Sequence, residues 1–117
     1  MSETNLFPPL KPAVFYILLA LADQESHGYA VMQAVRERSG GLVPLRTGSF
    51  YRHLSKLLDA GIVAEAARRP ADADPRRGAH YRLTPRGQKL LAAEKQRLAD
   101  LAASMGAWRP ASRKGSL

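Results

Sequence analysis

The sequence contains no cysteine among its 117 residues. Disulfide scaffolds, cysteine-ligated zinc, iron–sulfur clusters and thiol catalysis are therefore excluded. The longest apolar run, residues 13–22, is far shorter than the roughly 20 residues that a membrane-spanning helix needs. Residues 1–11 include Glu3 and two prolines without a basic cluster, so we expect neither a secretory signal nor a membrane partner, and a cytoplasmic location.

Motifs of catalysis are also missing. No P-loop, dinucleotide-binding glycine motif, HExxH zinc motif or nucleophile elbow occurs. The histidines His27, His53 and His80 fall on different expected elements without metal-ligand spacing. Asp72 and Asp74 are a loop pair with no histidine near them in sequence. The sequence therefore predicts a protein that is not an enzyme and holds no metal or cofactor.

Positive charge, in contrast, is abundant. Lysine and arginine number 18 against 10 acidic residues, for a formal net charge of +8. Residues 46–97 hold twelve basic and five acidic side chains, whereas residues 1–45 carry a net charge of −1. A local basic excess in a chain about one domain long favours a polyanionic partner, with nucleic acid first and an anionic membrane surface second.

Proline and hydrophobic spacing predict two helices at the start of the chain. Pro12 fits the first turn of a helix of roughly three turns that is apolar on all its faces. A small monomer cannot cover such a helix completely, so part of it is expected to pack against a second chain. A second helix is expected from Ser26 or His27 to Arg38, before two glycines.

A third helix, capped by Thr47 and ending at Ala60, has two contrasting faces. Its apolar residues fall on one side at 100° per residue, and Tyr51 lies at the edge of that side with a hydroxyl able to meet a phosphate. The other side carries Ser49, Arg52, His53 and Lys56, and Thr47 at the start of the helix is a further candidate DNA contact. Hydroxyl and cationic groups pair with base edges and phosphates, so we predict a helix that enters the DNA major groove. An ordinary solvated face is the alternative.

Two short strands, residues 62–66 and 79–83, are predicted to form a hairpin with a long arginine-rich loop. Tyr81 and Leu83 share one side of the second strand. The basic side chains expected to contact phosphates here are Arg68, Arg69, Arg76, Arg77 and Arg82. A solvated basic loop is the alternative.

A C-terminal helix is predicted to begin with Thr84 as its cap and Pro85 in its first turn, and to run to Trp108. Its apolar positions recur at steps of 3 and 4 residues, with Glu94 as one polar member of the seam. Because a helix of about 36 Å exceeds what so small a domain can cover, we expect it to pair with its own copy. The dimer contacts expected are Phe15, Leu18, Leu91, Leu98, Leu101, Met105 and Trp108.

The order of these elements is that of a winged helix-turn-helix, a mostly α fold with a small β-hairpin. Its expected division is a flexible N-terminus (1–9), a DNA-binding domain (10–84), a dimerisation helix (85–108) and a disordered basic tail (109–117). Four sequence segments give more specific information than the order of elements: His27-Gly28-Tyr29-Ala30-Val31-Met32, Thr47-Gly48-Ser49-Phe50-Tyr51, Leu54-x-x-Leu57-x-x-x-Gly61-Ile62-Val63 and Tyr81-Arg82-Leu83-Thr84-x-x-Gly87.

Together these segments resemble the PadR family of bacterial transcriptional regulators, over roughly residues 10–105. The resemblance implies a homodimeric repressor of an inverted-repeat operator, with the third helix in the major groove and the wing near the backbone or the minor groove. It also implies a small aromatic effector between the subunits, beside Trp108 and Phe15. A packing anchor at a frayed helix end is the alternative for Trp108.

Two departures from the family pattern bear on these expectations. Arg52 stands where many members have proline, which favours a base or phosphate contact in place of a backbone constraint. Asp72 and Asp74 argue against deep insertion of the wing tip into the minor groove. The competing function is a winged-helix dimer that acts mainly as a ligand-binding or protein-interaction module with weak, non-specific DNA binding.

Overall fold

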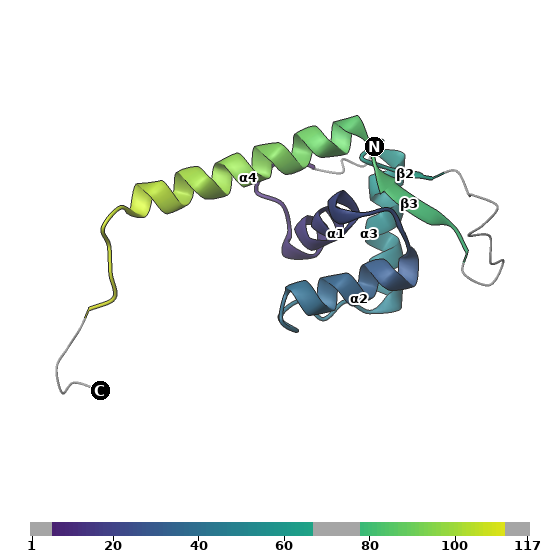
Figure 1. Cartoon of the computed structure of the whole chain (residues 1–117), viewed down its shortest axis with the longest axis horizontal. Helices are drawn as coiled ribbons and strands as arrows, with labels where there is room; N and C mark the ends of the chain where they lie inside the picture. The colour runs from purple at the N-terminus through teal and green to yellow at the C-terminus, as the bar shows by residue number, and fades with distance from the viewer. Residues whose placement is uncertain (1–5, 67–77, 112–117) are drawn as a thin grey trace.

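The residues that the structure describes form four helices and a small antiparallel sheet (Figure 1). The computed structural model describes residues 6–66 and 78–111. Their arrangement confirms the mostly α winged helix-turn-helix predicted from the sequence. The elements, in chain order, are α1 (Pro12–Asp23), β1 (Ser26–His27), α2 (Gly28–Arg38), α3 (Thr47–Asp59), β2 (Val63–Glu65), β3 (His80–Leu83) and α4 (Pro85–Met105).

Helix α1 lies at the centre of the core, in contact with α2, β3 and α4. Pro12 occupies its first turn as predicted. Leu18 is fully buried inside the chain, so the expectation that it contacts a partner is wrong. Phe15, on the same helix, stays partly exposed and remains available to a second chain.

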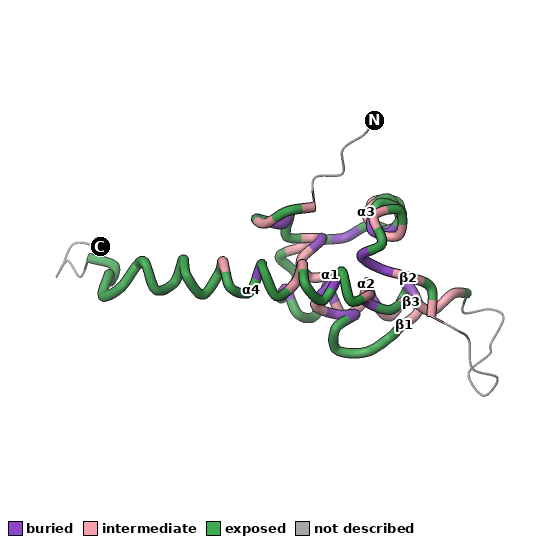
Figure 2. Tube along the Cα trace, turned by 90° about the horizontal axis from the view of Figure 1, so that it is seen from above, coloured by how far each residue is buried: buried purple, intermediate pink, exposed green. Residues whose placement is uncertain are grey.

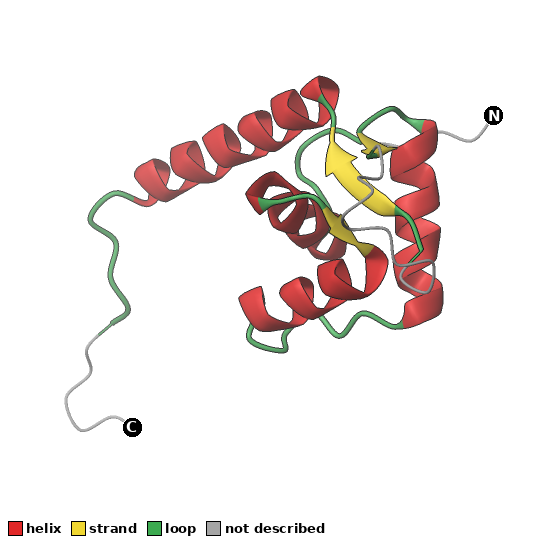
Figure 3. Cartoon of the chain, turned by 45° about the vertical axis from the view of Figure 1, so that its right-hand side comes forward, coloured by secondary structure: helices red, strands yellow, loops and turns green. Residues whose placement is uncertain are grey.

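The sheet has three strands in the order β1-β3-β2, all antiparallel, and not the two that were predicted (Figure 3). Strand β1 is only two residues long and pairs Ser26 with Tyr81 and His27 with His80. His27 also caps α2, where its Nδ1 accepts the Ala30 N–H at 3.4 Å. A strand of only two residues is too short to show an alternation of polar and apolar side chains, so the sequence pattern did not predict β1.

Helix α3 buries Phe50, Leu54 and Leu57 in the core. The predicted capping role of Thr47 is wrong, because Arg46 occupies the N-cap position and Thr47 is the first helical residue. No side-chain cap bond forms at this end of the helix.

Thr84 joins three parts of the fold. Its Oγ1 accepts the Gly87 N–H at 3.0 Å, as predicted for the cap of α4, and donates to the Gly61 carbonyl at 2.6 Å. Its own N–H donates to the carbonyl of Ile62 at 3.1 Å. The start of α4 is therefore held against the turn that leads from α3 into β2.

Helix α4 extends away from the body of the molecule (Figure 2). It ends at Met105, and Gly106 follows with a φ of +54°, so Trp108 lies outside the helix that was predicted to include it. Its buried residues are Gly87 and Glu94, both in the half that packs on the core. No helix in residues 6–66 and 78–111 is long and apolar enough to cross a membrane.

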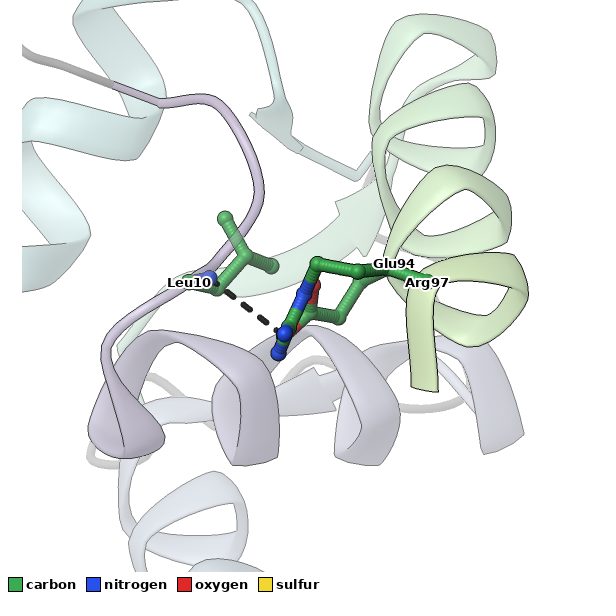
Figure 4. A network of polar contacts seen from close by, with 3 residues as sticks. All are labelled: Leu10, Glu94 and Arg97. Carbon is green, nitrogen blue, oxygen red and sulfur yellow. Dashed lines mark hydrogen bonds and ion pairs between the residues drawn. The ribbon is translucent and has the colours of Figure 1, made fainter. Parts of the chain in front are cut away.

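Glu94 binds the N-terminal segment to α4 (Figure 4). Its Oε2 accepts the Leu10 N–H at 3.3 Å, and its carboxylate accepts two hydrogen bonds from Arg97, the shorter at 2.8 Å from Nε. The bond from Arg97 lowers the pKa of Glu94 although burial opposes that shift, and the Leu10 N–H assists. The predicted polar member of the dimer seam is thus used within the chain.

Glu94→Gln is expected to lower the free energy of unfolding by about 1 kcal/mol at neutral pH, since it removes the charge from these bonds. A carboxylate whose folded-state pKa is lowered stabilises above its unfolded-state pKa of about 4.3, and that contribution is lost as pH falls through the folded-state pKa. Urea unfolding at fixed protein concentration should therefore show a gap between wild type and variant at pH 7 that shrinks below about pH 4. If the difference in unfolding free energy between wild type and variant does not change with pH, the Glu94 carboxylate does not stabilise the fold through its charge.

Candidate nucleic-acid interface

The face of α3 opposite the core carries the side chains that the sequence singled out. Arg52 and Lys56 are exposed, while Ser49 and His53 are partly buried at the margins of this face. Thr47 is exposed in the first turn. Because Phe50, Leu54 and Leu57 hold the helix by its other side, this polar and basic face is presented to solvent as one surface. We call these four residues the α3 face: Ser49, Arg52, His53 and Lys56.

His53 is the residue of the α3 face whose pKa is shifted by its surroundings. Burial lowers its pKa, and the nearby positive charges of Lys11, Lys56 and Arg52 lower it further. These effects favour the neutral imidazole, in which one ring nitrogen donates a hydrogen bond and the other accepts one. A neutral imidazole suits a hydrogen bond to a base or phosphate better than a contact that depends on charge.

Tyr51 lies at the meeting point of α2, α3 and the sheet. Its ring packs edge-on against Phe50, with centroids 4.8 Å apart, and 46% of the residue is exposed. A Cβ on Gly28 would come within 2.5 Å of the Tyr51 hydroxyl oxygen, so the hydroxyl rests over the first residue of α2. Glycine at this position allows that close approach. The sequence motif includes Gly28, but it does not reveal that the Tyr51 hydroxyl is the group that lies against it.

The wing is described only in part. Arg82 is exposed on β3, opposite Ala64 of β2. The remaining predicted phosphate ligands lie outside the described residues, as do the two aspartates of the loop: Arg68, Arg69, Arg76, Arg77, Asp72 and Asp74.

Two basic residues that the sequence analysis did not select also border the α3 face. Arg46 is exposed at the N-cap of α3. The positive charge of Lys11 lowers the pKa of His53, although 42 residues separate the two in the sequence. Arg46 could have been inferred from its place beside Thr47, but the position of Lys11 arises from tertiary packing, which no local pattern reveals.

A second, apolar surface lies between α1 and α4. Phe15, Leu19, Leu91 and Leu98 line a groove with a volume of about 290 Å³, together with Gln88, Ala92 and Lys95. Beyond the groove, Leu98, Leu101 and Met105 continue along α4 with 38%, 51% and 51% exposure. Trp108 is 64% exposed and is not among the residues that line the groove. We call Leu98, Leu101 and Met105 the α4 stripe.

The described residues hold no cluster of three or more histidine, aspartate or glutamate side chains placed to bind a metal ion. The site is thus one of polar and basic groups at a protein surface. The sequence model of the transcriptional regulator PadR-like family matches residues 17–93.

The chain belongs to the PadR-like family of transcriptional regulators.

Solved structures share its fold. A PadR family transcription regulator from Clostridium difficile is 22% identical, with a TM-score of 0.68, and the match covers 81% of this chain and 95% of that one. A transcriptional regulator from Clostridium thermocellum is 21% identical, with a TM-score of 0.60 and coverage of 81% and 92%. BpsR of Bordetella bronchiseptica, whose DNA binding is regulated by 6-hydroxynicotinic acid, is 23% identical, with a TM-score of 0.62 and coverage of 92% and 75%. No curated protein matches the sequence.

Membership of the PadR-like family makes this chain a DNA-binding transcription regulator, a class of protein that is generally not enzymatic and is typically dimeric. In this PadR-like protein the matched residues include all of α2 and α3 and residues 85–93 of α4. The α3 face is therefore part of the region by which the family is recognised.

Proposed function

We propose that this PadR-like regulator is a cytoplasmic homodimer that represses transcription by binding an inverted-repeat operator, with α3 of each subunit in the major groove. The observation that carries the proposal is the α3 face. It sets Arg52 and Lys56 in solvent on a helix whose other side is locked into the core, so the groups that would read DNA are on a rigid element.

The α4 helix is the element through which two copies of the chain would pair. The α4 stripe leaves three large apolar side chains exposed on a helix that stands away from the core (Figure 2). Burying them against the same stripe of a second copy would remove apolar surface from water and give a two-fold symmetric dimer. To read two half-sites of an inverted repeat, the α3 helices of such a dimer must lie about 34 Å apart, one turn of DNA.

We further propose that a small aromatic ligand at the dimer interface releases the protein from DNA. The groove beside Phe15 supports this, because it is apolar and adjoins the α4 stripe. Trp108 would contribute only from the partner chain or after rearrangement, since it lies beyond the end of α4. A ligand can act in this way only if it binds more tightly to a dimer geometry in which the two α3 helices no longer fit the operator.

The deciding experiment is selection from a random DNA library with purified protein at about 150 mM salt, because the apparent specificity of a basic protein depends on salt. An enriched inverted repeat supports the proposal and gives the half-site spacing. A flat profile would contradict it and favour the ligand-binding or protein-interaction module instead.

Arg52→Ala is expected to relax the preference at one position of each half-site, with a loss of about 1–3 kcal/mol for the preferred base. Competition binding with a set of single-base operator variants measures this. Lys89→Ala is the matched control, because Lys89 is an exposed basic residue on α4 and not on α3. Equal weakening on every sequence would instead assign Arg52 to a phosphate.

A further inference from the structure

A cavity of about 490 Å³ separates the N-terminal segment, residues 6–11, from α3. Val14 and Leu57 give it apolar walls, and three nitrogen-bearing side chains stand around it: Lys11, His53 and Lys56. Among the residues that line it, all of them described, there is no carboxylate. Lys11 and Lys56 are both exposed, so their ammonium groups are within reach of a partner from solvent.

Positively charged side chains gather around this cavity in the free chain. His53 has its pKa lowered by burial and then by Lys11, Lys56 and Arg52, and no negative group contributes to that shift. Lys11 is the residue that precedes α1, whereas Arg52, His53 and Lys56 belong to α3. Positive charges placed together, with no carboxylate among the residues that line the cavity, attract an anion to the space between them.

The position of Lys11 is also fixed, although it lies near the start of the chain. The preceding residue, Leu10, is buried and donates its N–H to Glu94 of α4 (Figure 4). The following residue, Pro12, begins α1. Lys11 is thus anchored on both sides, so holding a ligand costs less conformational entropy than it would from a free tail.

We propose that Lys11 and Lys56, with His53, bind one phosphate of the DNA backbone at the flank of the groove that α3 enters. The inference rests on the proposed function and extends its interface to a segment outside the helix-turn-helix. His53 and Lys56 belong to the α3 face, so an anion held between them and Lys11 lies along the same surface as the duplex. A phosphate contact of this kind adds affinity without sequence preference.

The test is Lys11→Ala in the full chain, with DNA affinity measured from about 50 to 300 mM salt on operator and random duplexes. The expected result is a loss of roughly 3- to 10-fold on both duplexes and a fall of about one in the magnitude of the salt slope, with the base preference unchanged. Lys89→Ala should leave affinity and slope as in wild type, and Lys11→Arg should restore most of the affinity. Unfolding curves of all variants check that the fold is kept.

The possible failures are distinguishable. If wild type selects an operator but Lys11→Ala binds with unchanged affinity and slope, the phosphate contact is overturned and the proposed function stands. If wild type shows no preference for any duplex, the proposed function fails before Lys11 is tested. Inorganic phosphate, titrated at constant ionic strength while the NMR signals of His53 are followed, tests the other source of the anion. Saturation by phosphate together with unchanged DNA binding in Lys11→Ala would reassign the site to a free anion.

Discussion

Replacing Gly87 with alanine is expected to lower the free energy of unfolding by about 2–3 kcal/mol, although it adds a single methyl group. Gly87 is buried in the first turn of α4. A Cβ at this position would collide with the carbonyl oxygen of Ile62 and come within 2.6 Å of Leu83 Cδ1. The carbonyl belongs to the backbone and already accepts the N–H of Thr84, so the clash can be relieved only by moving α4 away from the sheet.

The matched control is Gly48→Ala in α3. A Cβ on Gly48 would meet no atom of the described chain within 4 Å, and the residue is helical. Alanine there should leave stability unchanged or raise it by up to about 1 kcal/mol, through helix propensity alone. Urea unfolding of both variants at one protein concentration makes the comparison. Equal midpoints for Gly87→Ala and wild type would mean that α4 does not start against the sheet at this point.

The helices were predictable because their signals are local. Pro12 at the start of α1 and the Thr84-Pro85 pair at the start of α4 are capping patterns that depend on neighbouring residues. The contrast between the faces of α3 follows from the helical period, and the structure buries Phe50 and exposes Arg52 accordingly. Backbone hydrogen bonding and side-chain spacing are sufficient for these elements.

The remaining features depend on contacts between distant parts of the chain. Glu94 belongs to the heptad pattern of α4, yet it binds Leu10, 84 residues earlier. Leu18 is as apolar as Phe15, and only the packing of α1 decides that one is buried and the other partly exposed. Lys11 approaches His53 for the same reason. Tertiary packing selects among faces that the sequence leaves equivalent.

This selection divides the predicted seam of α4 into two parts. Toward the start of the helix, Leu91 packs against the core and Glu94 is buried. Farther along, the side chains of the α4 stripe are exposed, and Leu101 at its centre is 51% exposed. The surface left for a second copy is therefore shorter than the heptad pattern suggested, and a single change at Leu101 should disturb most of it.

Leu101→Glu is accordingly expected to convert the proposed dimer into a monomer at micromolar concentrations, because it sets a charge in the middle of each buried stripe. Operator affinity should fall by about 100-fold or more, since a monomer binds one half-site and loses the gain from linking two. Sedimentation velocity and binding to full and half operators measure the two effects.

The control for charge is Ala103→Glu, two residues along the same helix and therefore about 200° around its axis. Ala103 is exposed, so the added carboxylate faces solvent and the dimer should persist. Far-UV circular dichroism then separates the loss of pairing from the loss of the helix. If Leu101→Glu stays dimeric while Ala103→Glu dissociates, the copies meet on the opposite side of α4, and the groove beside Phe15 is not part of their interface.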